Sequence, residues 1–178
     1  LFDYPRTDVP VKRGSRYFFT HNAGLQPQSI LYVQDGMDGG RRVLLDPNTL
    51  SPDGTVALTA ISPSDDGTLL GYALSKSGSD RQEIHVREVA TGRDRADRVQ
   101  WAKFTGIVWL KDGSGFYYTR FPEPGRVPAG DENYYGAIYL HRLGEEAVDS
   151  EAGEQEDREL RNAVGRPQEL SENEVVHQ

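Results

Sequence analysis

The side chains that could do chemistry in this 178-residue chain are few, and their spacing fits none of the familiar catalytic or metal-binding motifs. Cysteine is absent, and no serine lies in the Gly-x-Ser-x-Gly turn that exposes the nucleophile of a hydrolase. None of the four histidines has a second histidine or a carboxylate at the spacing of a zinc site; they are His21, His85, His141 and His177. We therefore predict no catalytic residue, no metal site and no cofactor on this chain, with His85 and His141 as ordinary strand residues facing solvent or a neighbouring sheet.

Asp-Gly pairs recur along the chain, and three of them are each followed by a β-rich run: Asp53-Gly54, Asp66-Gly67 and Asp112-Gly113. The surroundings of Asp66 lack the alternating ligands and the distal glutamate of a calcium loop, so a turn is the better interpretation. The glycine cluster at 36–40 likewise fits a hairpin turn and not a phosphate-binding loop. Because 46 residues separate Asp66 from Asp112, the repeat is close to the roughly 40–50 residues of one four-stranded propeller blade.

Short β-rich runs bounded by turn-forming residues fill the first 144 positions, and no convincing helical stripe interrupts them. The runs are Tyr17–Thr20, Ser29–Gln34, Arg42–Leu45, Val56–Ser62, Thr68–Leu74, Glu83–Val89, Ile107–Leu110, Gly115–Phe121 and Ala137–Leu143. They predict an all-β fold, a partial β-propeller of about three four-stranded blades near residues 14–48, 56–101 and 104–144, with a loop at 122–136. Three blades are fewer than the 4–8 that close a propeller, so open edge strands predict dependence on a partner segment.

Charge divides the chain into the blade region, 1–144, and an acidic tail, 145–178. The blade region carries 17 basic and 17 acidic side chains, whereas the tail carries 3 basic and 11 acidic ones. The tail lacks aromatic residues and has few large aliphatic ones, which predicts disorder or a helix docked elsewhere. A solvated extension and a segment for a basic partner both stay open. The neutral blade region and acidic tail argue against nucleic-acid binding.

Hydropathy gives no sign of a membrane segment or of an export signal. No run approaches the roughly 18 apolar residues of a membrane-spanning helix. The start at Leu1 shows neither the basic nor the apolar part of a secretory signal. We therefore expect a soluble protein that does not bind membranes, and the absence of cysteine does not distinguish cytoplasm from periplasm.

Several separate strings of this sequence, in the same order, resemble one known family. They are RYFFTHNAGLQPQSILYV (16–33), RVLLDPNTLSPDGTVAL (42–58), YALSKSGSDRQEIHVREVATG (72–92) and KFTGIVWLKDGSGFYYTRFP (103–122). They resemble the N-terminal β-propeller of prolyl oligopeptidases, serine peptidases that cut after proline, over about residues 4–144. One departure is Arg81, which follows the SGSD turn where the family often carries tryptophan.

The resemblance implies that the chemistry belongs to a part of the protein unlike this chain. In the family, the catalytic serine, aspartate and histidine lie in an α/β-hydrolase domain, which would be the partner of this propeller. The propeller covers the active site and admits only short peptides, and the hydrolase cleaves them after proline through an acyl-enzyme. By itself this chain is then expected to be inactive. The alternative from a different class is a stand-alone propeller-type binding or scaffold module with no enzymatic activity.

Aromatic residues near position 104 are the remaining candidates for a functional role. Phe104 matches a family phenylalanine on the propeller face toward the hydrolase domain, which implies contact with the substrate segment that precedes proline. An apolar ring suits this task because it removes area from water without requiring a hydrogen bond. We expect Trp101 and Trp109 to fill the space between blade sheets. The exposed tyrosines among Tyr117, Tyr118, Tyr134 and Tyr135 stabilise the sheet or form an interface.

Overall fold

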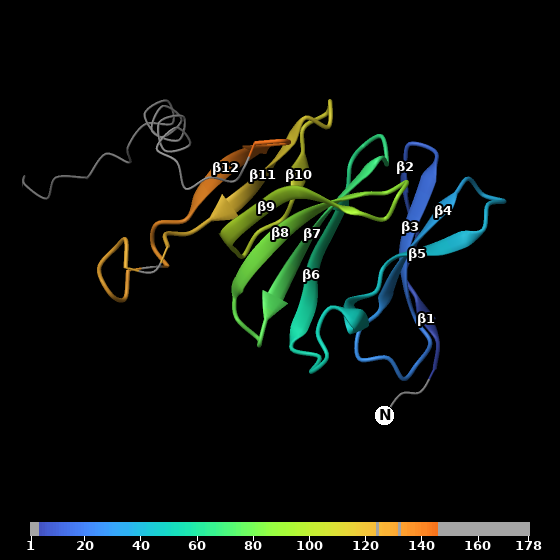
Figure 1. The fold of residues 1–178 in the computed structure, drawn as a ribbon, viewed down its shortest axis with the longest axis horizontal. Helices are drawn as coiled ribbons and strands as arrows, with labels where there is room; N and C mark the ends of the chain where they lie inside the picture. Colours follow the sequence, from blue (N-terminus) through green and yellow to red (C-terminus); the bar gives the residue numbers. More distant parts are fainter. Residues whose placement is uncertain (1–3, 124, 132, 146–178) are drawn as a thin grey trace, which may run out of the picture. The chain divides into compact units, whose positions relative to one another are not determined.

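A computed structural model of the chain describes residues 4–123, 125–131 and 133–145 (Figure 1). These residues form twelve β-strands and one short 3-10 helix, η1, and contain no helix long and apolar enough to cross a membrane. The strands are β1 (Arg6–Thr7), β2 (Val11–Arg13), β3 (Arg16–Asn22), β4 (Ile30–Asp35), β5 (Arg41–Leu45), β6 (Val56–Pro63), β7 (Leu69–Lys76), β8 (Arg81–Glu88), β9 (Asp94–Lys103), β10 (Val108–Trp109), β11 (Gly115–Arg120) and β12 (Ala137–Arg142).

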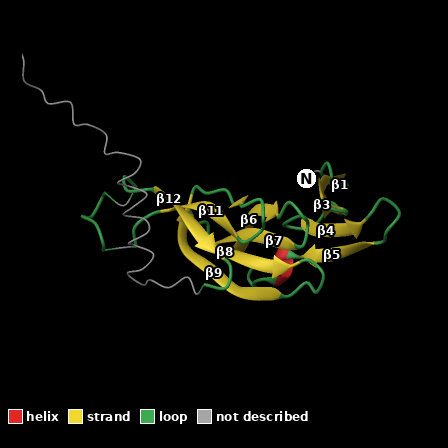
Figure 2. Ribbon diagram, turned by 90° about the horizontal axis from the view of Figure 1, so that it is seen from above, coloured by secondary structure: helices red, strands yellow, loops and turns green. Residues whose placement is uncertain are grey.

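The first sheet is an antiparallel meander of β3, β4 and β5, drawn in blue to cyan in Figure 1. β1 and β2 pair with successive parts of β3, Thr7 opposite His21 and Val11 opposite Phe18, so together they form one interrupted edge strand. Pro10 lies in the interruption, and proline has no N–H to give to a ladder. The helix η1 (Pro47–Thr49) lies in the connection from β5 to β6 (Figure 2).

The second sheet begins as a regular antiparallel meander of β6, β7, β8 and β9. β11 then pairs with β10 on one edge and β12 on the other, and a single pair, Ala102 with Arg120, links β9 to β11. This link places the end of β9, and the residue that follows it, at the junction between the β6–β9 meander and the β10–β12 strands.

Two hydrophobic cores lie on opposite faces of the β6–β9 meander, because neighbouring residues of β7 point to opposite sides. Leu70 and Tyr72 join the first core with residues of the first sheet; its other buried members are Phe18, Leu31, Val33, Leu44, Leu45 and Val89. Ala73 joins the second core, with Ile84, Val86, Val99, Ala102, Ile107, Phe116 and Tyr118. Antiparallel sheets stacked face to face in this way form a partial β-propeller, and the predicted all-β fold is confirmed.

The Asp-Gly pairs at 53–54, 66–67 and 112–113 form one kind of turn. Each glycine has a φ near 70°, a left-handed backbone that favours glycine. Each aspartate accepts a hydrogen bond from the backbone N–H two residues later, at 3.2 Å for Asp53, 2.9 Å for Asp66 and 3.0 Å for Asp112. These bonds, with those from neighbouring hydroxyl groups, hold the pKa of each carboxyl below its ordinary value. Turn formation therefore accounts for the repeat.

Strands β1, β2 and β9 were missed by the sequence prediction. β1 and β2 are two and three residues long, too short for a periodic signal. β9 reads DRADRVQWAK, in which Asp97 is buried, so its pattern is not that of an apolar strand. The blade limits remain a prediction, and the predicted acidic tail lies outside the described residues except for Glu145.

Candidate functional site

Phe104 follows directly after β9 and is the predicted substrate-contacting residue. The residue is 72% exposed, and its backbone has a φ of 49°, in the left-handed region that non-glycine residues rarely occupy. Trp101, three residues earlier, has a φ of 62°. Left-handed residues of this kind cost free energy and persist only where the surroundings hold them. The end of β9 therefore presents an aromatic ring to solvent on a strained backbone.

Two neighbours hold the Phe104 ring. The ring of Phe121 meets it edge to face, with centroids 6.2 Å apart and planes at 83°. The Lys103 ammonium lies 5.0 Å from the Phe104 ring and 5.8 Å from the Phe121 ring, within the range of a cation–π interaction. The exposed ring therefore rests on a second aromatic ring and on a positive charge.

Lys103 also contacts residues from two other segments. Its ammonium donates a hydrogen bond to Oδ1 of Asn133 at 2.7 Å and pairs with the carboxylate of Asp80. The hydrogen bond from Lys103 holds the pKa of Asp80 below its ordinary value. The site therefore combines the turn before β8, the end of β9 and the loop between β11 and β12.

Arg81 takes part in the local packing despite its departure from the family pattern. Its guanidinium carbon lies 5.3 Å from the ring centre of Trp101, so cation and ring stack. The carbonyl of Trp101 accepts a hydrogen bond from the N–H of Phe121 at 3.2 Å, and this bond fixes the strand end from the other side. Trp109 packs against the second core and donates its indole N–H to the carbonyl of Ser62 at 2.8 Å, which confirms its expected packing role.

Two strand histidines, His85 and His141, make their contacts with residues other than Phe104. His141 is buried, and its Nε2 lies 3.2 Å from Oδ1 of Asp97. Asp97 also accepts hydrogen bonds from Nε of Arg95 at 2.9 Å and the N–H of Gly144 at 2.6 Å. This cluster joins β9 to β12. His85 stacks on Tyr72, and burial lowers its pKa although the nearby Glu83 acts in the opposite direction.

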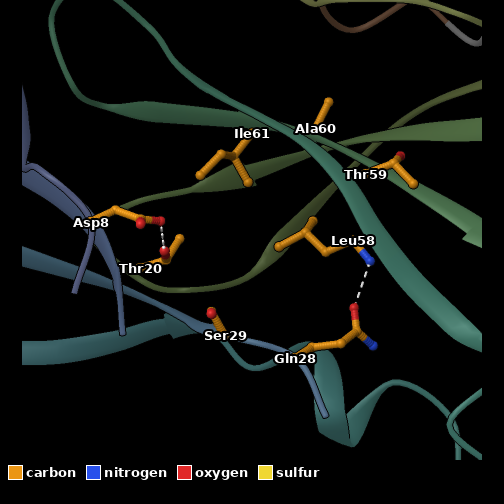
Figure 3. A pocket seen from close by; sticks show the side chains of 8 residues that line it. All are labelled: Asp8, Thr20, Gln28, Ser29, Leu58, Thr59, Ala60 and Ile61. Carbon is orange, nitrogen blue, oxygen red and sulfur yellow. Dashed lines mark hydrogen bonds between the residues drawn. The ribbon is translucent and has the colours of Figure 1, made fainter. Parts of the chain in front are cut away.

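A cavity of about 360 Å³ lies between the first sheet and β6 (Figure 3), and Phe104 is not among the residues that line it. Its lining residues are Asp8, Thr20, Gln28, Ser29, Leu58, Thr59, Ala60 and Ile61. Gln28 accepts a hydrogen bond from the N–H of Leu58 at 2.9 Å and donates one to the carbonyl of Val56 at 2.7 Å. Asp8 accepts a hydrogen bond from Thr20. The polar lining thus connects the two sheets, and within the described residues no group of three or more His, Asp and Glu side chains could hold a metal ion.

Comparison with known proteins agrees, over most of the chain, with the family resemblance seen in the sequence. Residues 1–164 match the sequence model described as prolyl oligopeptidase, N-terminal beta-propeller domain. The chain belongs to the prolyl oligopeptidase family. The match extends beyond the predicted limit of the resemblance, residue 144, into the acidic segment.

Individual relatives cover about four-fifths of this chain. A prolyl endopeptidase of Elizabethkingia meningoseptica is 36% identical over 146 residues, which are 81% of this chain and 20% of that protein. Prolyl oligopeptidase A of Galerina marginata is 34% identical over 171 residues, covering 80% of this chain and 23% of that protein. The chain thus spans only about a fifth of the length of these relatives.

Solved structures of the family share the fold. A structure from a study of two prolyl endopeptidases, concerned with inter-domain dynamics in catalysis and specificity, has a TM-score of 0.78 and 32% identity, covering 82% of this chain and 22% of that one. Prolyl oligopeptidase B of Galerina marginata bound to a 25-residue macrocyclization substrate has a TM-score of 0.68 and 32% identity, covering 80% of this chain and 22% of that one.

The family resemblance predicted Phe104 as a site residue but none of the residues that contact it. No sequence motif marks the residues around Phe104, which are Lys103, Asp80, Phe121 and Asn133. Lys103 is the last residue of β9, a strand whose charged sequence lacks the pattern of a buried strand. The signals that could have located the cluster are the adjacent Lys-Phe pair and the aromatic Phe121 immediately before the loop insertion. Among the four candidate tyrosines, Tyr118 is buried, whereas Tyr117, Tyr134 and Tyr135 are exposed.

Proposed function

We propose that this chain is the non-catalytic propeller part of a serine peptidase that hydrolyses short proline-containing peptides after proline. The observation that carries the proposal is the family match over residues 1–164, together with relatives named prolyl endopeptidase and prolyl oligopeptidase. Because the chain spans about a fifth of those relatives, the nucleophile would belong to an α/β-hydrolase domain in the same protein. The propeller would limit which substrates reach that domain.

Phe104 would contact the substrate residues that precede proline. The exposure of its ring and its fixed position on Phe121 and Lys103 support this role, because a ring held in place before binding loses little freedom when a peptide covers it. Covering an exposed phenylalanine contributes about 1.5–3 kcal/mol of apolar burial. Phe104 would therefore add affinity for apolar side chains.

An exposed apolar face supports the requirement for a further segment of protein. Val108, Tyr117 and Ile138 are 62%, 40% and 69% exposed. Strand register places them on one face of the β10–β12 strands, because Val108 is opposite Tyr117, and Ile138 is opposite the residue two positions after Tyr117. More of the propeller, supplied by the same protein, would cover this face.

The test is the intact mass of the natural protein together with cleavage of a chromogenic peptide that carries proline before the chromophore. A mass several times 19.9 kDa with cleavage supports the proposal. A larger mass without cleavage would favour the binding or scaffold module. Cleavage by a protein of about the mass of this chain would refute the assignment of the nucleophile to another domain.

Substitution of Phe104 tests its role within the active protein. Phe104→Ala is expected to raise KM for a peptide with an apolar residue before proline by roughly 10-fold or more, because the apolar contact is lost. The matched control is Leu25→Ala, at a residue that is 76% exposed and lies in the connection between β3 and β4. An equal KM in the two variants would rule out the proposed contact of Phe104.

A further inference from the structure

Lys103 is buried although it carries a charge. Its side chain is only 11% exposed, whereas lysine side chains ordinarily reach water. A buried ammonium needs partners for its three N–H groups. Asp80 and Asn133 accept two of them, and the rings of Phe104 and Phe121 lie beside the cation. The ammonium thus joins groups from three segments of the chain.

We infer that Lys103 is a positioning residue that fixes two parts of the peptide-binding surface, the Phe104 ring and the loop between β11 and β12. The inference rests on the proposed function and deepens it, because it assigns the preference for apolar residues before proline to an internal charge. Lys103 does not need to touch the peptide. It acts through the groups that it holds.

The Phe104 ring depends on Lys103 because little else holds it. Because Phe104 is 72% exposed, its ring gains little from burial, and its left-handed backbone is unfavourable. Two contacts that hold the ring are the edge-to-face pair with Phe121 and the Lys103 cation. Removing the positive charge leaves the ring with one support and more freedom to rotate.

The loop depends on Lys103 through Asn133. A Cβ atom at Gly136 would lie 2.7 Å from Cζ of Phe121, so the loop backbone packs directly against that ring. The hydrogen bond from Lys103 to Asn133 fixes the same loop three residues earlier. Tyr134 and Tyr135, 81% and 54% exposed, lie between these two attachments. Lys103 therefore sets the distance between Phe104 and the two tyrosines, which form the second aromatic part of the surface.

The kinetic test compares Lys103→Met with Lys103→Arg in the natural full-length protein. Methionine keeps the apolar stem without the charge, and arginine keeps the charge. The substrates are two chromogenic prolyl peptides, with either phenylalanine or glycine among the residues before proline. We expect Lys103→Met to raise KM for the phenylalanine peptide roughly 3- to 30-fold, as loss of a partly buried cation–π contact predicts.

The expected pattern distinguishes positioning from general damage to the fold. In Lys103→Met, kcat and the KM for the glycine peptide are expected to stay within twofold of the wild type, and Lys103→Arg should restore most of the preference. The matched control is Lys12→Met in the first sheet, where the ammonium lies 5.9 Å from the ring of Tyr17. Equal changes for both peptides, a fall in kcat alone, or no change would overturn the inference.

A second readout does not depend on activity. Arg126 is an exposed trypsin site in the same loop, with its side chain 70% exposed. Cleavage after Arg126 is expected to accelerate at least tenfold in Lys103→Met and to keep the wild-type rate in Lys103→Arg and Lys12→Met. An unchanged rate in Lys103→Met overturns the inference whatever the activity. If the wild type cleaves neither peptide, the proposed function fails, and the tryptic rate still decides whether Lys103 fixes the loop.

Discussion

Gly67 and Gly113 offer a direct test of the contact between the two sheets. Both glycines follow an aspartate in the same kind of turn and have a φ of 71°. A Cβ at Gly113 would meet nothing within 4 Å, whereas a Cβ at Gly67 would lie 2.5 Å from the carbonyl oxygen of Arg13. Gly14, in the facing turn, is equally crowded, with a Cβ position 2.2 Å from the carbonyl oxygen of Asp66. The two turns approach so closely only because both carry glycine.

The structure sets the expected difference between Gly67→Ala and Gly113→Ala. A left-handed alanine costs roughly 1–2 kcal/mol in either variant. At Gly67 the added methyl group must also push the facing turn away. That movement breaks the bond from the N–H of Gly14 to the carbonyl of Asp65, 3.0 Å, and the bond from Arg16 to the carbonyl of Gly67, 2.8 Å. At about 0.5–1.5 kcal/mol each, their loss adds about 1–3 kcal/mol.

Hydrogen exchange followed by mass spectrometry on the intact natural protein measures this difference. We expect amides in a peptide covering residues 11–22 to exchange roughly 5- to 150-fold faster in Gly67→Ala than in Gly113→Ala, the equivalent of 1–3 kcal/mol. Equal exchange in the two variants would refute the reasoning. It would mean that backbone strain, common to both, accounts for the whole effect.

Two further predictions concern the buried part of the second sheet. Burial would raise the pKa of Asp97, but hydrogen bonds from Arg95, the Gly144 N–H and His141 hold it below the ordinary 3.8. Asp97 therefore stabilises the fold above about pH 4, and this stabilisation is lost as the pH falls through the folded-state pKa of Asp97. Below about pH 4 the melting temperature should therefore fall more steeply with pH in the wild type than in Asp97→Asn. Parallel pH profiles of the two melting temperatures would contradict the prediction. Phe116→Ala should lower the free energy of unfolding, measured by urea denaturation, by about 3–5 kcal/mol because Phe116 is fully buried. The control is Tyr117→Ala, at a residue that is 40% exposed, and a similar loss there would argue against burial as the cause.

The regular strands and the turns follow from local sequence. β3, β4 and β6 alternate or concentrate apolar residues strongly enough to be located within one or two residues of their ends. The Asp-Gly turns are equally local, because each aspartate bonds an amide only two residues away. Fold class could be predicted for this reason, since β-runs separated by such turns leave few alternatives to stacked antiparallel sheets. Phe104 was found through family resemblance and not through any local pattern.

The charged strand β9 and the surroundings of Phe104 could be recognised only in the folded structure, because both depend on long-range contacts. β9 pairs along its length with β8, and its buried Asp97 finds a partner in His141, 44 residues later. Lys103 likewise finds Asn133 across 30 residues. Without these partners the charged side chains would be more stable in water, so the local sequence pattern predicts that they lie on the surface. Local sequence was therefore sufficient for the regular strands, the turns and the family resemblance, whereas the burial of charge beside Phe104 depends on contacts between distant segments that form only when the sheets stack.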